Sequence, residues 1–326
     1  MTIIPFAFYL VMVELAVGAF LTMYALDVRN DSAINFFRTQ GVIYFFLFSV
    51  LAWATQNGFA TPHQLQLDGF KLDYSWLNRQ PPLLGWFLIA QIPYNVALWF
   101  NSRIGRLVFG GITAALGLAT LFVDGMGMRP IAAAWGGGFF TVSAFLLGAL
   151  ALGGVSTAML LGHWYLNTPT ASGKPLEFAT WLTIGGIALQ VVCGLLTGPT
   201  TYTHPATTAI APPPAAASIT IDKTLHTQGV ISAATVPPSP VGTPSPVGTP
   251  TPPKSSVPSG VTFPTPVLIL LQYILGLGVP LGLSILALRL ERDRSFQSAT
   301  GMLYIAVVFT FFGEILARGL FLRPLA

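Results

Sequence analysis

Residues 4–26 read IPFAFYLVMVELAVGAFLTMYAL, and the single charged residue among them is Glu14. A helix that crosses a bilayer needs about 20 mostly apolar residues, and this stretch meets that requirement. The apolar run starts close to Met1, with no basic region before it and no clear small-residue cleavage site after it. We therefore interpret it as a first membrane span and not as a signal peptide.

The composition of the whole chain agrees with a membrane protein. Of 326 residues, 53% are hydrophobic and 8% are charged, with a mean hydropathy of +0.69. A soluble domain carries about 25% charged residues, so this chain cannot build a water-exposed surface of normal size, and the lipid bilayer is its expected solvent. The net charge of +4 comes from basic residues that are too sparse for a nucleic-acid-binding surface. The lone cysteine, Cys193, excludes a disulfide framework.

Further apolar stretches follow the first one along the chain. With it they predict an all-α integral membrane protein, a bundle of about eight transmembrane helices. The expected spans are roughly 4–26, 37–56, 82–101, 106–123, 137–163, 178–199, 266–288 and 299–321. An even number of spans places both termini on the same side of the membrane.

The segment 200–265 has a different composition from the spans on either side of it. It contains three consecutive prolines at 212–214 and a direct repeat, SPVGTP, at 239–244 and 245–250. Such density of proline and glycine predicts a polyproline-II or disordered loop. We expect three regions: helices one to six in 1–199, a Pro-, Thr- and Ala-rich outer loop in 200–265, and helices seven and eight in 266–326.

The basic residues indicate the orientation. The sequence RLERDR at 289–294 lies in the short loop expected between spans seven and eight. Short loops rich in Lys and Arg stay on the cytoplasmic side, whereas long loops are translocated largely regardless of charge. We therefore expect both termini and the Pro-rich loop outside.

Three charged residues stand out inside the expected spans, away from the span ends at Arg38 and Arg106: Glu14 in the first, and Glu314 and Arg318 in the last. A charge inside a membrane costs roughly 2.5–3.5 kcal/mol on insertion scales, so each is a candidate for function. Glu314 and Arg318 are four residues apart and share a helix face. If the first and last spans touch, Arg318 could bridge both carboxylates. Either the three form a structural ion pair, or a carboxyl here serves a proton-coupled site.

Other polar residues offer weaker signals. His163 lies at the end of span five beside Trp164 and Tyr165, where we expect an interface anchor that hydrogen-bonds a neighbour. A transmembrane b-haem needs two histidines at matched depth, and His163 is alone on its side of the membrane, so we expect no haem. No other set of residues has the spacing of metal ligands, so we expect no metal site. Pro93, flanked by Gln91 and Asn95, interrupts span three; the sequence favours a structural kink there over a ligand cavity.

The last span carries a resemblance to a known family. Residues 311–321 read FFGEILARGLF. This resembles the last helix of the membrane anchor subunit of dimethyl sulfoxide reductase, one of the polysulfide-reductase-type anchors, which shows Gly-Glu-Leu-x-Gly-Arg, an apolar pair and an aromatic residue. Gly313, Glu314, Arg318 and Phe321 match; Ala317 replaces a glycine. The first span, VELAVGAF at 13–20, is similar to the small-residue first helix of that family.

The resemblance implies an anchor in a bacterial cytoplasmic (inner) membrane that docks an iron–sulfur electron-transfer subunit and a catalytic subunit. Such an anchor oxidises menaquinol, or another quinol, near the outer face and releases its protons there. Glu314 and Arg318 would then be catalytic, with Glu14 and His63 in the quinol site. The family's histidine, in a His-Leu-Gly segment after span two, is absent, because 53–58 read WATQNG. Either His63, five residues beyond Gly58, substitutes for it, or quinol oxidation has been lost.

Two other classes of function remain open at the level of sequence. The chain could be a non-catalytic structural or accessory subunit of a larger membrane complex, with Glu14, Glu314 and Arg318 in a closed ion-pair network. It could also be a small-solute transporter, which would require a site at the middle of the membrane near Gln91 and Asn95.

Overall fold

The computed structural model describes residues 3–30, 32–57, 72–130, 138–168, 172–197 and 265–322, and their regular structure is helical. Each expected span coincides with a long helix, which confirms the helical pattern. The elements are α1 (Ile3–Arg29), α2 (Ile34–Asn57), α3 (Tyr74–Leu77), α4 (Gln80–Trp99), α5 (Arg103–Met128), α6 (Gly138–Asn167), α7 (Lys174–Thr197), α8 (Thr265–Leu271), the π-helix η3 (Gln272–Gly278), α9 (Val279–Arg292) and α10 (Phe296–Leu322).

Within these residues, seven helical segments are long and apolar enough to cross a membrane. They are α1, α2, α5, α6, α7, the continuous segment formed by α8, η3 and α9, and α10. The chain is therefore a multi-pass, all-α membrane protein. Helix α4 is 20 residues long but is not among the seven, although it packs along α5 and α2 in the same bundle.

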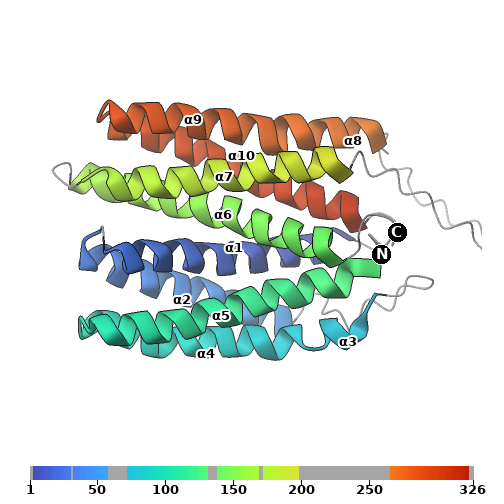
Figure 1. Ribbon diagram of the computed structural model, residues 1–326, viewed down its shortest axis with the longest axis horizontal. Helices are drawn as coiled ribbons and strands as arrows, with labels where there is room; N and C mark the ends of the chain where they lie inside the picture. Colours follow the sequence, from blue (N-terminus) through green and yellow to red (C-terminus); the bar gives the residue numbers. More distant parts are fainter. Residues whose placement is uncertain are drawn as a thin grey trace, which may run out of the picture. The chain divides into compact units, whose positions relative to one another are not determined.

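Helices α1 and α6 form the centre of the bundle (Figure 1). On one side of them lie α2, α4 and α5, and on the other lie α7, α9 and α10. In the most apolar stretch of each helix, 78% is buried inside the bundle in α1 and 67% in α6. The corresponding share in the α8–α9 segment is 22%. The outer helices expose large apolar side chains, as lipid-facing helices do.

Small residues bring the two central helices together. A Cβ atom on Gly18 would lie 1.8 Å from the carbonyl oxygen of Ala149, and one on Gly153 would lie 2.0 Å from the carbonyl carbon of Gly18. Membrane helices approach this closely only through small residues, because lipid supplies no hydrophobic force that favours helix association. The packing of α1 on α6 fixes the side chains that α1 presents to the other helices.

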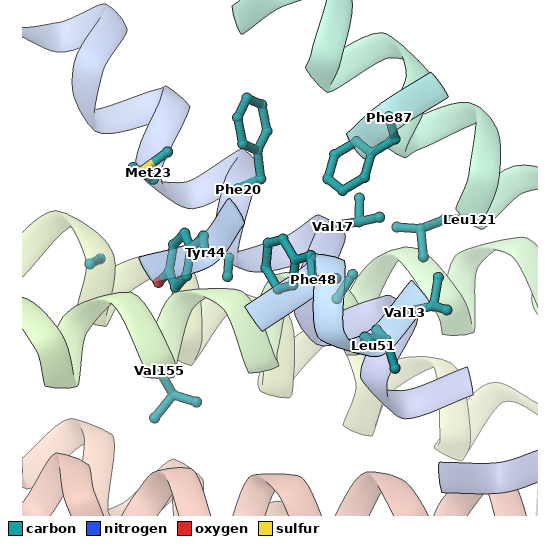
Figure 2. Packing of buried hydrophobic residues seen from close by; sticks show 14 of the residues in the cluster. Val13, Val17, Phe20, Met23, Tyr44, Phe48, Leu51, Phe87, Leu121 and Val155 are labelled. Carbon is teal, nitrogen blue, oxygen red and sulfur yellow. The ribbon is translucent and has the colours of Figure 1, made fainter. Parts of the chain in front are cut away.

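A mainly aromatic and aliphatic core surrounds α1 (Figure 2). Phe20 on α1 meets Phe87 on α4 edge to face, with ring centroids 5.7 Å apart. Tyr44 and Phe48 on α2 stack at 5.5 Å, and the Tyr44 hydroxyl lies 3.1 Å from Oγ1 of Thr157 on α6. These contacts tie α2 and α4 to the central pair.

The described ends of the chain, at the start of α1 and the end of α10, lie at one end of the helical unit (Figure 1). We call this the terminal end, and the other the turn end. Short connections at the turn end place Asn30, Asn101 and Arg294 in the left-handed backbone region, with φ of 57°, 53° and 56°. Asparagine adopts that conformation more readily than most residues with a side chain.

The chain divides into two units, Met1–Tyr202 with Pro264–Ala326 and Thr203–Phe263. The second unit lies outside the described residues. The expected extended character of the Pro-rich segment therefore stays a prediction.

Candidate functional site: a buried arginine among carboxyl groups

Arg318 bridges the two glutamates, an arrangement that the sequence allowed if the first and last spans touch. Its Nη2 lies 2.5 Å from Oε1 of Glu14 on α1 and 3.8 Å from Oε2 of Glu314, one turn earlier on α10. The three residues are at most 5% exposed. The first and last spans thus touch, which was the condition for this arrangement, and we call these three residues the Arg318 cluster.

Helix α6 supplies the floor of this cluster. The carbonyl oxygen of Ala144 accepts a hydrogen bond of 3.0 Å from Nη2 of Arg318, and the guanidinium lies 4.2 Å from the centroid of the Phe145 ring. A Cβ atom on Gly148 would be 2.9 Å from Oε2 of Glu14 and 3.0 Å from Arg318 Nη2. Glycine at 148 therefore gives the charged groups the space in which they meet.

Helix α7 contributes a fourth polar side chain. Nε2 of Gln190 donates to Oε1 of Glu314 at 2.5 Å. Gln190 is partly exposed, and its neighbour Leu189 is 50% exposed, so this edge of the cluster approaches the lipid-facing surface. Within the described part of the chain, Oε2 of Glu14 has no hydrogen-bond partner.

Asp124 on α5 is a third carboxyl group close to the cluster. It is 1% exposed and interacts electrostatically with Arg318 and with Glu14. Among the described residues, its Oδ2 has no hydrogen-bond partner. The sequence analysis missed this residue, because it ended the fourth span at 123. The apolar run that continues past Asp124 as GMGM was the available signal.

These groups lie in the same half of the bundle. At about 1.5 Å per residue, Glu14 lies about 17 Å from the start of α1, and Glu314 and Arg318 lie about 12 and 6 Å from the end of α10. Asp124 is about 6 Å from the end of α5, which is also at the terminal end. The cluster is thus nearer the terminal end than the turn end.

The charge balance decides what the cluster can do. Among the described residues, two carboxyl groups pair with the one guanidinium and a third, that of Asp124, interacts with it electrostatically. Full ionisation would therefore leave a net negative charge in a water-poor interior. Burying an unpaired charge there is costly, and neutralisation by a proton is the inexpensive alternative. The arrangement can therefore hold protons and exchange them.

A second buried arginine lies at the turn end. Nη1 of Arg106 is 2.7 Å from Oδ1 of Asp27, and the hydroxyl of Tyr94 donates to Oδ2 of Asp27 at 3.2 Å. Arg103 donates to the carbonyl oxygens of Asp27 and Val28 at the end of α1. This pair, which we call the Arg106 pair, was also missed by the sequence analysis, which ended the first span at 26.

A further buried carboxyl group, Glu291, lies near the turn end of α9. It is 2% exposed, and its Oε1 accepts a hydrogen bond of 2.7 Å from Thr180 on α7. Its described interactions are with Thr180, Glu177 and Arg292 and not with the Arg318 cluster, so it is a useful reference for that cluster.

Two histidines were singled out in the sequence. His63 lies outside the described residues, so its part in a quinol site stays a prediction. His163 is exposed, and its Nδ1 is 3.4 Å from the Tyr304 hydroxyl, which agrees with an anchor that contacts a neighbouring helix.

The segment around Pro93 is closely packed. Gln91 is 1% exposed, the amide of Asn95 donates to the Gln91 carbonyl at 2.9 Å, and a Cβ atom on Gly41 would lie 2.3 Å from Oδ1 of Asn95. Helix α4 continues through Pro93. These contacts fit the structural interpretation of this segment better than a ligand cavity.

Within the part of the chain that the structure describes, no group of three or more His, Cys, Asp or Glu side chains is arranged to hold a metal ion. No protein-family model matches the chain, and neither a curated protein nor a solved structure matches it significantly. The likeness of α10 to a quinol-oxidising anchor therefore rests on its own residues.

Proposed function

We propose that this chain is the membrane anchor subunit of an electron-transfer complex and that it exchanges protons with a membrane quinol at the Arg318 cluster. The observation that carries the proposal is the excess of buried carboxyl groups over the one guanidinium, with Oε2 of Glu14 unpartnered among the described residues. The motif GEILAR at 313–318 supports quinol as the proton donor.

The residues fit the chemistry that a quinol requires. As a quinol gives up its electrons, its hydroxyl protons must leave, and a nearby carboxylate can accept them as a general base. Glu314 is the base that we assign, and Arg318 holds it and Glu14 in place. Among the described residues, Oε2 of Glu14 has no hydrogen-bond partner and can accept a proton in turn. The electrons would pass to a docked iron–sulfur subunit, and the protons would leave toward the nearer side of the membrane.

The proposal includes eight crossings, with α4 as the eighth. The polar residues Gln80 and Gln91 lower the average hydropathy of α4. Both side chains are buried, so they do not expose polar groups to lipid. Its exposed face carries an apolar strip at helical spacing, namely Trp86, Ile89, Ile92, Val96 and Trp99. A tryptophan near each end of such a strip is typical of a helix that reaches both membrane interfaces.

The proposed orientation places the terminal end outside. The turn end carries most of the described basic residues, namely Arg29, Arg38, Arg103, Arg106, Lys174, Arg289, Arg292 and Arg294. Positive residues in short connections favour the cytoplasmic side. The Arg318 cluster then lies in the outer half of the bilayer, where protons released from a quinol would reach the outer face of a bacterial inner membrane.

The test compares two buried carboxyl groups in the complex purified from native membranes. Glu314→Gln removes a carboxyl group from the cluster, and Glu291→Gln removes one at the turn end and keeps an acceptor for Thr180. We expect Glu314→Gln to lower the rate of quinol oxidation by about 10²–10⁴-fold, the usual contribution of a positioned base. We expect Glu291→Gln to leave the rate unchanged. An unchanged rate in Glu314→Gln would remove the catalytic assignment.

A structural or accessory role is the second candidate, and the burial of the cluster favours it. Glu14 is 0% exposed, and Gln190, Ala144 and Phe145 close around its partners. In this case Glu314→Gln would reduce the amount of assembled complex without changing the rate per complex. Mass spectrometry of the purified complex, for an iron–sulfur protein and bound quinone, separates the two candidates further.

A further inference from the structure

We infer that Asp124, Tyr9 and Gln80 form a proton path from the Arg318 cluster to the terminal end of the bundle. This inference rests on the proposed function, because it supplies the route by which protons taken up at the cluster would leave. It assigns roles to three residues on three helices that the cluster itself does not include.

The outer part of the path is a hydrogen bond between two buried side chains. Nε2 of Gln80 donates to the hydroxyl oxygen of Tyr9, and the two residues are 0% and 5% exposed. Gln80 is the first residue of α4, and the residues before it, Asn78 and Arg79, are exposed. This contact therefore begins where the protein meets the aqueous interface and leads inward to α1.

The middle of the path joins Tyr9 to Asp124. Tyr9 lies about 9 Å from the start of α1, and Asp124 about 6 Å from the end of α5, so the two are at similar depth. The helices pack against each other, and the two side chains interact electrostatically. A tyrosine hydroxyl is both a donor and an acceptor, so it can take a proton from a carboxyl group and pass one to a water molecule. The Gln80 amide only donates to Tyr9, so it orients the hydroxyl, and its oxygen, which has no partner among the described residues, offers a place for that water.

The inner part of the path joins Asp124 to the cluster. Gly125, the next residue on α5, is so close to α6 that a Cβ atom there would be 2.6 Å from Cα of Val142. Two residues further on α6, the carbonyl oxygen of Ala144 accepts a hydrogen bond from Arg318. The close contact of α5 with α6 thus fixes the position of Asp124 relative to the helix that Arg318 contacts, and Asp124 interacts electrostatically with that arginine.

Unpartnered acceptors mark both ends and the middle of this route. Among the described residues, Oε2 of Glu14, Oδ2 of Asp124 and Oε1 of Gln80 are buried and accept no hydrogen bond. Buried polar atoms are normally satisfied, and those without a protein partner are usual places for an ordered water or a proton. Asp73 and Arg129, also at the terminal end, pair with each other at 2.7 Å.

The path is tested by carboxyl infrared spectroscopy of the full-length protein in lipid nanodiscs. The band of protonated carboxyl groups is followed after transfer into deuterated buffer, and its exchange rate is measured. We expect Tyr9→Phe and Gln80→Leu each to slow the exchange by on the order of 10²-fold, the lower end of what a positioned proton-transfer group contributes. Tyr44→Phe, which removes another buried tyrosine hydroxyl, is the matched control and should exchange at the wild-type rate.

The outcomes separate the path from the function on which it rests. If the wild-type band is lost in Glu14→Gln or Glu314→Gln, but Tyr9→Phe and Gln80→Leu exchange as fast as wild type, the path is wrong and the proposed function stands. If neither glutamate variant changes the band, the cluster holds no exchangeable proton and the proposed function is wrong as well. Gln80→Leu, at the helix terminus, keeps the test decisive if Tyr9→Phe does not fold.

Discussion

Arg318 and Arg106 are both buried arginines beside carboxylates, but their surroundings differ in charge. At the Arg106 pair, both oxygens of Asp27 are engaged, one by Arg106 and the other by Tyr94, and Arg103 lies close by. At the Arg318 cluster, carboxyl groups outnumber the described cation. Oε2 of Glu14 and Oδ2 of nearby Asp124 have no hydrogen-bond partner among the described residues. A balanced pair at the end of a helix can fix packing, whereas an excess of carboxyl groups deep in the bundle can exchange protons.

The largest expected effect comes from unbalancing the Arg106 pair. In Asp27→Asn, Arg106 would remain buried without a charged partner, and we expect a loss of about 3–5 kcal/mol in the free energy of unfolding. Titration of the detergent-solubilised protein with a denaturing detergent measures it. The double variant Asp27→Asn with Arg106→Gln should recover much of the loss. A cost no greater than that of an exposed ion pair would show that the pair is not structural.

Filling the space at Gly148 should have an intermediate effect. In Gly148→Ala the new methyl group would lie 2.9–3.2 Å from the charged groups of the Arg318 cluster, and we expect a loss of about 1–3 kcal/mol. Gly185→Ala is the control, because a Cβ atom there has no neighbour within 4 Å. Equal stability of the two variants would mean that the cluster can move aside.

Removing one carboxyl group from the Arg318 cluster should cost little. In Glu14→Gln, Arg318 keeps Glu314 at 3.8 Å, so we expect a change of about 1 kcal/mol or less, the net contribution of one hydrogen bond. The same unfolding titration applies. A loss as large as that of Asp27→Asn would indicate a balanced structural ion pair and would contradict the argument from excess carboxyl groups.

The smallest effect is expected at the partly exposed pair of Asp73 and Arg129. A hydrogen bond from Ser75, and then Arg129, lower the pKa of Asp73 below its ordinary value. A carboxyl group whose pKa is lowered by folding stabilises the folded state when the pH is above its ordinary pKa. This stabilisation is lost as the pH falls through the lowered pKa. Asp73→Asn should therefore slightly weaken the acid dependence of stability. Arg129 is about half exposed, so added salt should reduce the effect further.

The sequence predicted the spans and the shared helix face of Glu314 and Arg318, because apolar length and i, i+4 spacing are local properties. It left the contact of Glu14 with Arg318 conditional on whether the first and last spans touch. It missed Asp27 and Asp124 for one shared reason. A hydropathy criterion ends a span at a charged residue, whereas α1 and α5 continue through these aspartates beside arginines on other helices. Which helix supplies a partner depends on packing, such as the contact of Gly18 with Ala149, and no local pattern encodes it.

The π-helix between α8 and α9 has a consequence for changes in chain length. A π turn accommodates an extra residue, and one residue corresponds to about 100° of rotation in an α-helix. Deleting a residue within Gln272–Gly278 would convert this turn to α-helix, and the two halves of the span would rotate relative to each other. Either Gly276 would lose its contact with Gly313, or Glu291 would turn away from Thr180. The extra residue of the π turn thus lets Gly276 face α10 and Glu291 face α7 within one continuous span.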